Sequence, residues 1–236
     1  MIAEDISYSH DGTEMSGRLF APDGSSGLPG VLVVHGAHGL DDFVLSASER
    51  LASQGLAVLA VDLWGGRAQL ADPRRIGAQL SRFAQDRAGW MGRVEAARRA
   101  LAARPEADGT RIAALGYCFG GTTVLEFARS GGAVRGVVSF HGGLDLVAED
   151  WAAAARVPVL ICTGAADPLA GPEHLARITA AMSAAAIPWE ADIHGGVMHA
   201  FTEPDRPGRP PFARYDARAD RRSWAAMTDF LASIFA

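Results

Sequence analysis

Short runs of apolar residues alternate with longer amphipathic stretches along most of this 236-residue chain. Runs rich in Val, Ile, Leu and Ala predict strands that are buried on both faces of a sheet. These runs cover residues 31–36, 56–63, 111–117, 134–143, 157–167 and, more weakly, 188–196. Amphipathic stretches predict helices over residues 41–55, 93–105, 122–132, 173–185 and 217–235. Strand alternating with helix predicts an α/β fold, a mostly parallel sheet with helices on both faces.

The first residues follow a different pattern. Segments 4–10 and 14–22 alternate polar and apolar residues and are joined by Asp11-Gly12, a strong hairpin signal. We therefore expect an antiparallel hairpin at the edge of the sheet. The Pro- and Arg-rich segment 202–216 predicts a surface loop, because no second core follows it. The chain is thus expected to form a single domain over residues 1–236.

Composition narrows the class of protein. Hydrophobic residues make up 49% of the chain and charged residues 21%, as in globular domains with a substantial core. The net charge of −5 argues against nucleic acid or an anionic membrane as the main partner. The first residues lack the apolar run of a secretory leader, and no segment approaches the roughly 20 apolar residues of a membrane span. With only two cysteines, a disulfide framework is excluded and a cytoplasmic location is expected.

Cys118 lies in the stretch GYCFGG at 116–121, where a predicted strand gives way to a predicted helix. This context matches a nucleophile elbow, a sharp strand-to-helix turn with the pattern G-x-nucleophile-x-G. The turn forces the nucleophile into an uncommon backbone conformation, and the small glycines leave room for it. It also places the thiol over a helix N-terminus, whose dipole favours the reactive thiolate. We interpret Cys118 as a catalytic nucleophile.

A carboxylate and a histidine follow the elbow along the chain, each at or after the end of a predicted strand. Asp167 ends the run at 157–167, and His199 lies in the Gly-rich stretch HGGVMHAF at 194–201. The order nucleophile, acid, histidine is that of the α/β-hydrolase fold. His199 would accept the thiol proton, and Asp167 would fix the tautomer of its imidazole.

An oxyanion hole is expected from two backbone N–H groups. Phe119 follows the nucleophile directly and would supply one of them, while Ala37, in the loop after the strand at 31–36, would supply the other. The expected reaction is cleavage of an ester or lactone through a cysteinyl thioester, with no metal and no cofactor.

Several candidates also have a purely structural interpretation. Free cysteine is usually a small buried hydrophobic residue, and this is our interpretation of Cys162, inside an apolar run. Asp167 precedes a proline, and Asp-Pro is also a turn signal. His194 and His141 compete with His199 for the catalytic role. We expect His194 to end a strand and His141 to line the substrate pocket.

Four motifs together resemble the dienelactone hydrolase family, the α/β-hydrolases whose elbow carries cysteine. They are AVDLWG at 60–65, GYCFGG at 116–121, AADPLAG at 165–171 and HAF at 199–201, and the segment YDARADRRSW at 215–224 also fits. The resemblance covers nearly the whole chain from residue 14 onward. It implies the α/β-hydrolase fold, the triad Cys118, His199 and Asp167, and hydrolysis of an ester or lactone.

Two positions depart from the family's pattern. The founding enzymes carry a glutamate after the strand that precedes the oxyanion loop, and it holds the resting thiol away from the histidine. Gly36 stands at that position here. They also carry an arginine shortly after the catalytic histidine, which grips the substrate carboxylate, and Glu203 stands near that position. We therefore expect a differently restrained thiol and a substrate without the carboxylate.

The remaining candidates surround the expected pocket. His35 and Gly36 belong to the oxyanion loop, and Tyr117 belongs to the elbow. Trp64 and Trp90 are interpreted either as a lid over the pocket or as core packing. A contact with an anionic group is the role expected of Arg67, in the loop after the strand at 56–63.

We therefore expect a hydrolase of small-molecule carboxylic esters or lactones that acts as a monomer or a small homo-oligomer. Two alternatives stay open. The same triad would serve a thioesterase or an acyltransferase, or the chain is a hydrolase-like binding protein without turnover. The absence of the family's glutamate and arginine favours the interpretation as a binding protein, whereas the intact cysteine, aspartate and histidine favour an enzyme.

Overall fold

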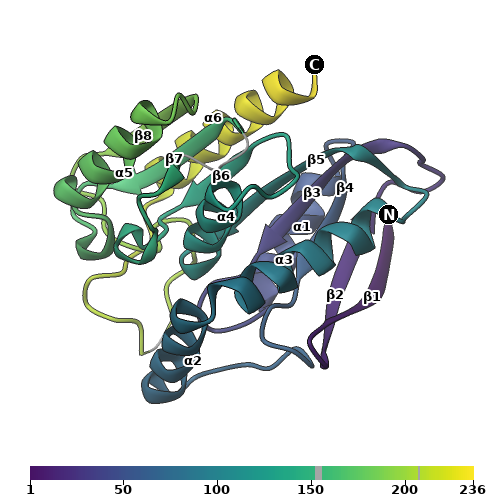
Figure 1. The fold of residues 1–236 in the computed structure, drawn as a ribbon, viewed down its shortest axis with the longest axis horizontal. Coiled ribbons are helices and arrows are strands. Elements are labelled where there is room, and N and C mark those ends of the chain that lie inside the picture. Colours follow the sequence, from purple (N-terminus) through teal and green to yellow (C-terminus); the bar gives the residue numbers. More distant parts are fainter. Residues whose placement is uncertain (152–155, 207) are drawn as a thin grey trace. The chain divides into compact units, whose positions relative to one another are not determined.

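The computed structural model describes residues 1–151, 156–206 and 208–236. Its contacts divide the chain into two units, Met1–Ala114 and Leu115–Ala236, which are considered in turn (Figure 1). Strand β5 (Ala107–Tyr117) runs from the first unit into the second. The single domain expected over residues 1–236 stays a prediction.

Strands of the first unit follow the order β1-β2-β4-β3-β5. Their bounds are Ile2–His10 for β1, Thr13–Ala21 for β2, Leu28–Val34 for β3 and Ala57–Val61 for β4. β1 pairs with β2 in antiparallel register, with His10 opposite Thr13, and β3 pairs with β4 in parallel register. Asp11 and Gly12 both have positive φ, 45° and 73°, as a tight two-residue hairpin turn requires. The predicted edge hairpin is confirmed.

The helices of the first unit include one that was not predicted from the sequence. α1 (Asp42–Ala52) buries Val44, Ser48, Leu51 and Ala52, which repeat at helical spacing. In place of one helix at 93–105, the chain forms α2 (Pro73–Gln85) and α3 (Arg87–Ala102). α2 buries only Phe83, although Ile76, Leu80 and Phe83 repeat at helical spacing; its other signals are the N-cap Asp72 and Pro73 in the first turn. Figure 1 shows α1 and α3 on opposite faces of β3 and β4.

Strands of the second unit follow the order β5-β6-β7-β8, and β6, β7 and β8 pair in parallel. β6 (Val137–Phe140) and β7 (Val159–Gly164) are buried at every residue. β8 (Trp189–His194) lies at the edge and exposes several side chains, which explains its weaker apolar pattern. His194 ends this strand, as expected. Because parallel strands end at the same edge of a sheet, residues that follow β5, β6 and β7 come together there.

Three α-helices accompany these strands in the described part of the unit. α4 (Phe119–Arg129) buries every residue from Phe119 to Ala128, and α5 (Pro172–Ala184) packs near β8. α6 (Ala217–Phe235) packs on β7 and β8 and has the bounds predicted from its amphipathic pattern. In Figure 1, α4 and α6 lie on opposite faces of β6 and β7. The predicted α/β class, with helices on both faces of a mostly parallel sheet, is confirmed.

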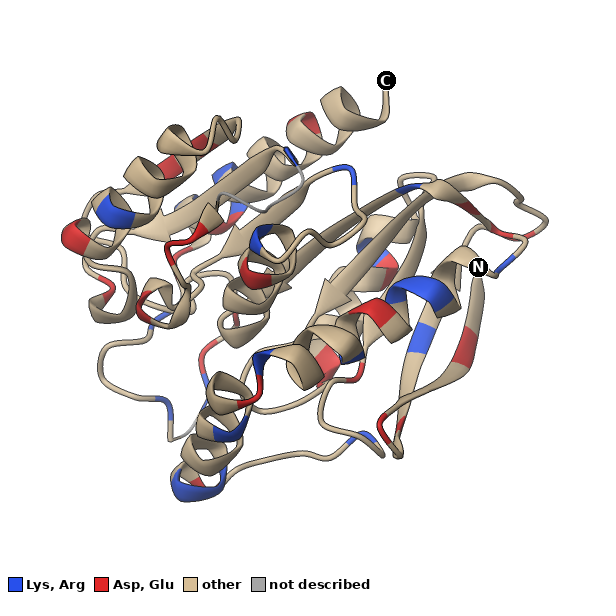
Figure 2. Ribbon diagram, in the orientation of Figure 1, with Lys and Arg blue, Asp and Glu red and all other residues tan. Residues whose placement is uncertain are grey.

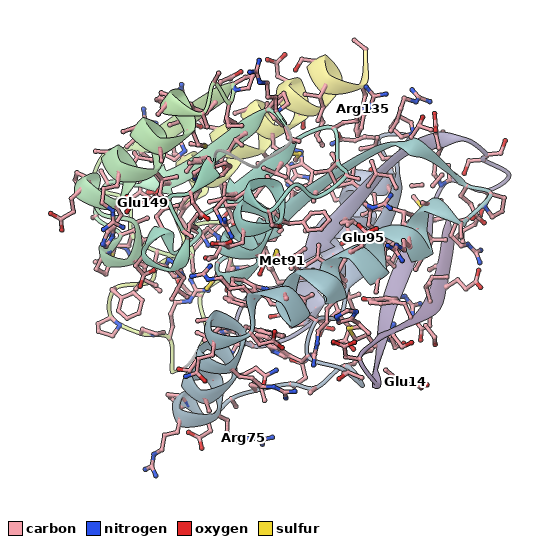
Figure 3. The ribbon with its side chains drawn as sticks, in the orientation of Figure 1. Glu14, Arg75, Met91, Glu95, Arg135 and Glu149 are labelled. Carbon is pink, nitrogen blue, oxygen red and sulfur yellow. The ribbon has the colours of Figure 1, made fainter. Side chains whose placement is uncertain are left out.

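Charged residues are interspersed along the described ribbon of each unit (Figure 2). Figure 3 labels Glu95 on α3. Its carboxylate accepts hydrogen bonds from Arg98 and Arg99. Among the described residues, no helix is both long enough and apolar enough to cross a bilayer.

Candidate active site

Cys118 occupies the turn between β5 and α4, with φ 53° and ψ −120°. This conformation is rare for a residue with a side chain and is typical of strained functional turns. The preceding glycine, Gly116, is required by close approach, because a Cβ there would lie 2.2 Å from the backbone of Gly120. Cys118 also caps α4 and is partly exposed. The predicted elbow geometry is therefore present in the backbone.

Asp167 follows β7 and uses its two carboxylate oxygens differently. Oδ1 accepts the backbone N–H of Leu169 at 2.9 Å and so caps the short 3-10 helix η3 (Pro168–Ala170). Oδ2 accepts a hydrogen bond from Nδ1 of His199 at 2.7 Å. The side chain is buried. Both interpretations of Asp167, turn residue and partner of the histidine, describe real contacts of this side chain.

His199 lies beyond β8 and is fixed by its backbone to the predicted loop 202–216. Its N–H donates to the carbonyl of Phe212, and its carbonyl accepts from Arg214, each at 3.0 Å. The described part of that loop forms no helix, and Pro207 within it lies outside the described residues. Nε2 of the imidazole lies 3.2 Å from Sγ of Cys118. The structure thus brings Cys118, His199 and Asp167 into one hydrogen-bonded line.

This line favours a positively charged imidazole. Burial of His199 by itself lowers its pKa, because a buried charge loses its hydration. The negative charge and hydrogen bond of Cys118, together with the carboxylate of Asp167, outweigh burial and raise the pKa to about 10. Cys162, by contrast, is fully buried, and burial raises the pKa of its thiol well above the usual value. The two cysteines therefore differ sharply in environment.

Replacing Cys118 with alanine is expected to lower the pKa of His199, because two of the contributions that raise it come from Cys118. A ¹⁵N NMR titration of the imidazole in both proteins measures this directly. An unfolded histidine titrates near pH 6.5, so native protein with a raised pKa binds the extra proton above that pH. Stability from this proton is full below about pH 6.5 and is lost as pH rises toward about 10.

The stability of the wild type should consequently fall more steeply over this alkaline range than that of the alanine variant. His10 supplies an internal reference in both spectra, since it lies far from the triad along the chain on the edge hairpin. Identical titration curves of His199 in the two proteins would contradict the assignment of Cys118 as its charged partner.

His141 also lies at this edge of the sheet, directly after β6. It is fully buried, and its ring approaches the ring of His199 edge-on with centroids 5.3 Å apart. Tyr117 is 2% exposed and stacks on Phe140 at 4.9 Å, so its contacts are those of the core. Thr202, which bonds to His141 at 2.8 Å, was not singled out from sequence. Its position three residues after His199 was the available signal.

Two candidates of the first unit, Trp64 and Arg67, donate their backbone N–H groups to Asp62, a fully buried carboxylate directly after β4. It accepts four backbone N–H groups, those of Ser16, Trp64, Gly65 and Arg67, at 2.8–3.1 Å. Trp64 is 7% exposed and stacks on Phe83, which stacks on Trp90. Of the two interpretations of these tryptophans, their contacts support core packing.

Arg67 binds the edge hairpin through its guanidinium. Nη2 forms an ion pair with Asp5 at 2.6 Å and a hydrogen bond with the carbonyl of Gly17, and Nε donates to the carbonyl of Ser16. These contacts support a structural role in place of the expected anion contact. These acceptors are distant in sequence and could not be read from a lone arginine, and the anion contact stays a prediction.

The oxyanion loop begins with His35, which is fully buried. Its Nε2 accepts from the N–H of Leu63 at 3.1 Å, and its Nδ1 donates to the carbonyl of Gly36 at 2.7 Å. Burial lowers its pKa, which fits this neutral, hydrogen-bonded form. Gly36 also accepts from Gly39, which shapes the turn that contains Ala37. The pocket role of His35 and Gly36 and the oxyanion role of Ala37 stay predictions.

Glu203 lies four residues after His199, near the position of the family's substrate-binding arginine. Its carboxylate is 3.5 Å from Nη2 of Arg209 and 3.9 Å from Nη2 of Arg206. The guanidinium of Arg209 also bonds to the carbonyls of Glu203 and Pro204 and to Asp205. Arg209 is therefore committed to holding this loop together.

A sequence model of the dienelactone hydrolase family matches residues 15–235. The chain belongs to the dienelactone hydrolase family. The crystal structure of a dienelactone hydrolase-like promiscuous phosphotriesterase from metagenomic libraries superposes with a TM-score of 0.93 at 35% identity. That match covers 100% of this chain and 99% of the other.

Two curated sequences are also similar to this dienelactone hydrolase family member. A probable 2-oxo-3-(5-oxofuran-2-ylidene)propanoate lactonase of Bradyrhizobium is 28% identical over 90% of this chain and 89% of its own length. An uncharacterized protein of Caenorhabditis elegans is 34% identical over 61% of this chain and 93% of its own length. The predicted family, the α/β-hydrolase fold and the class of enzyme, a hydrolase of small-molecule esters or lactones, are confirmed.

Proposed function

We propose that this dienelactone hydrolase family enzyme cleaves its ester or lactone through a thioester formed on Cys118. The observation that carries the proposal is the continuous line from thiol to carboxylate. Sγ lies 3.2 Å from Nε2 of His199, whose Nδ1 lies 2.7 Å from Oδ2 of Asp167. A nucleophile, a base and a residue that orients the base, each within reach of the next, is the arrangement of covalent acyl-transfer catalysis.

In the acylation step, the Cys118 thiolate attacks the carbonyl carbon and the carbonyl electrons move onto oxygen. The N–H of Phe119, the first residue of α4, is the proposed donor to this oxyanion. As the C–O bond breaks, the leaving alkoxide takes the proton from Nε2 of His199. The products are the acyl thioester and a free alcohol, which stays attached to the acyl group when the substrate is a lactone.

Deacylation reverses these roles. Neutral His199 removes a proton from water, and the resulting hydroxide attacks the thioester carbon. Collapse of the tetrahedral adduct expels the Cys118 thiolate beside the reprotonated imidazole and releases the carboxylic acid. Throughout both steps Asp167 keeps the Nδ1 proton in place, so that Nε2 always faces the reacting atoms. Ala37 stays a predicted second oxyanion donor.

Substrates without a carboxylate fit the loop after His199 best. Glu203 is itself an anion, and Arg209 already contacts three carbonyls and two carboxylates of this loop. We therefore propose neutral esters and lactones as the substrate class. A panel of p-nitrophenyl esters, γ-lactones, dienelactones and an acyl thioester tests this choice. A neutral phosphotriester belongs in it because of the 35% identical metagenomic enzyme.

The acyl-enzyme can be trapped directly. Acid quenching of the enzyme during turnover of p-nitrophenyl acetate, followed by peptide mass mapping, is expected to place the acetyl group on Cys118. Cys162 is the internal control, since it is fully buried and burial raises its pKa. Steady turnover with no acetyl group on Cys118 at any quench time would contradict the thioester mechanism. An acyl group that passes to added alcohol in place of water would identify an acyltransferase.

A further inference from the structure

His141 contacts both Cys118 and His199 of the proposed triad, although the proposed reaction gives it no chemical role. It directly follows β6 with φ 39°, a left-handed conformation that residues other than glycine rarely adopt. It is fully buried, and its backbone N–H donates to the carbonyl of Cys162 on β7 at 2.8 Å. A strained, buried histidine at the edge that carries the nucleophile needs a physical explanation.

The imidazole of His141 makes a hydrogen bond on each side. Nδ1 accepts the backbone N–H of Cys118 at 3.1 Å, an N–H that it shares with the carbonyl of Phe140 at 3.0 Å. Because Nδ1 accepts, the ring proton lies on Nε2, which donates to the hydroxyl of Thr202 at 2.8 Å. One ring therefore joins the backbone of the nucleophile to the loop that carries His199.

The surroundings of the ring keep it neutral. Burial lowers the pKa of His141, and the positive charges of His199 and Arg209 lower it further. The ring packs edge-on against His199 at 5.3 Å and against Phe201 at 5.2 Å, and lies 6.0 Å from Tyr117. A neutral ring supplies one acceptor and one donor without competing with His199 for the proton of the thiol.

The loop at the far end of this bridge is also strained. Ala200, next to His199, has φ 53°, so the residues with positive φ include Cys118, His141 and Ala200, each in or beside the candidate site. Such conformations persist only where surrounding contacts determine them. Arg209 binds carbonyls within this loop, but the hydroxyl of Thr202 is what connects the loop to His141 and thus to the elbow.

We propose that His141 is a positioning residue. Its hydrogen bonds to the N–H of Cys118 and the hydroxyl of Thr202 fix the position of the His199 loop relative to the elbow. Its effect is the 3.2 Å approach of Nε2 to Sγ. It transfers no proton and contacts no substrate. This inference rests on the proposed function of Cys118 and His199, because the relative position of their side chains affects catalysis only if they react together.

Thr202→Val tests the bridge with little change in volume, because it removes the hydroxyl and keeps the branched side chain. The expected result is a loss of roughly 10- to 100-fold in kcat for p-nitrophenyl acetate with KM nearly unchanged. Alkylation of Cys118 by iodoacetamide should also slow, since the same approach of His199 to Sγ activates the thiol. Thr202→Ser restores the hydroxyl and should recover most of both rates.

A matched control is available at Thr163 on β7. Its hydroxyl is buried and has no hydrogen-bond partner among the described residues, so Thr163→Val should leave both rates near those of the wild type. His141→Asn is the second variant: its amide oxygen replaces the Nδ1 acceptor, but the shorter side chain does not reach Thr202. It should resemble Thr202→Val in both rates, and melting curves confirm that each protein is folded.

The outcomes separate this inference from the proposed function. If folded Thr202→Val and His141→Asn both keep kcat and alkylation rates within about twofold of the wild type, the positioning role is overturned. The proposed function would still stand as long as acetyl-Cys118 forms. If no acetyl group forms on Cys118 in the wild type, the proposed function fails first, whatever the Thr202 variants do.

Discussion

Replacing Cys118 with alanine is expected to lower kcat for ester hydrolysis by about 10⁴-fold or more. Alanine removes the only group in the line of Cys118, His199 and Asp167 that can form the thioester, while the rest of the elbow is kept. The methyl group fits the space of the thiol, and the capping position on α4 involves no side-chain hydrogen bond, so folding should be preserved. Stopped-flow and steady-state assays with p-nitrophenyl acetate measure the loss.

The second cysteine provides the comparison for this variant. Cys162→Ala also removes one thiol, but from the buried interior of β7, and should leave kcat within about twofold of the wild type. A Cys118→Ala protein that kept a tenth or more of wild-type activity would show that water, activated by His199, attacks the substrate directly. The fold and family of the enzyme would be unaffected by that result.

Asp167→Asn is expected to lower kcat by about 10³- to 10⁴-fold while changing KM much less. Asparagine is nearly isosteric but carries no charge, and its amide group can donate a hydrogen bond to Nδ1. This favours the tautomer with its proton on Nε2, which cannot accept the proton of the thiol. Steady-state kinetics over a range of pH, with the same ester, measure the change.

The same variant distinguishes the two contacts that Asp167 makes. The oxygen that accepts from the N–H of Leu169 is retained in asparagine, which is also a good N-cap residue, so η3 should keep its cap. Asp167→Ala loses both contacts and should be less stable as well as inactive. If Asp167→Asn retained near-normal turnover at full stability, Asp167 would be a turn residue and the triad would lack its acid.

Local signals were sufficient for much of this fold. The amphipathic pattern over 217–235 predicted α6 at its observed bounds, and Asp11-Gly12 predicted the hairpin turn. Both depend on neighbours in sequence, which the pattern contains. α2 was missed although Ile76, Leu80 and Phe83 repeat at helical spacing, because Pro73, Gly77 and many polar residues accompany this short stripe. β5 begins at Ala107, four residues earlier than predicted, since its polar start (ADGTR) looks like a turn.

In the candidate site, too, features that depend on neighbouring residues were predictable and those that depend on distant residues were not. The elbow was predictable because a nucleophile, its glycines and the strand-to-helix change lie within six residues. The roles of His141 and Thr202 were not, because their hydrogen bonds join residues 23 to 61 positions apart. They also depend on positive φ values at His141 and Ala200, which neither residue type prefers. Arg67 is a further example, because its guanidinium binds Asp5 of the edge hairpin, 62 positions away in sequence.

Because the two cysteines differ in exposure, the active sites of this enzyme can be counted by labelling a thiol. Cys118 is partly exposed beside an imidazole, whereas Cys162 is fully buried. A fluorescent maleimide or iodoacetamide should therefore label each competent molecule once, without engineering of the chain. Dividing the activity of an unlabelled sample by the dye bound in an equal labelled sample then gives the activity per working site, and acyl compounds that occupy Cys118 should slow its labelling.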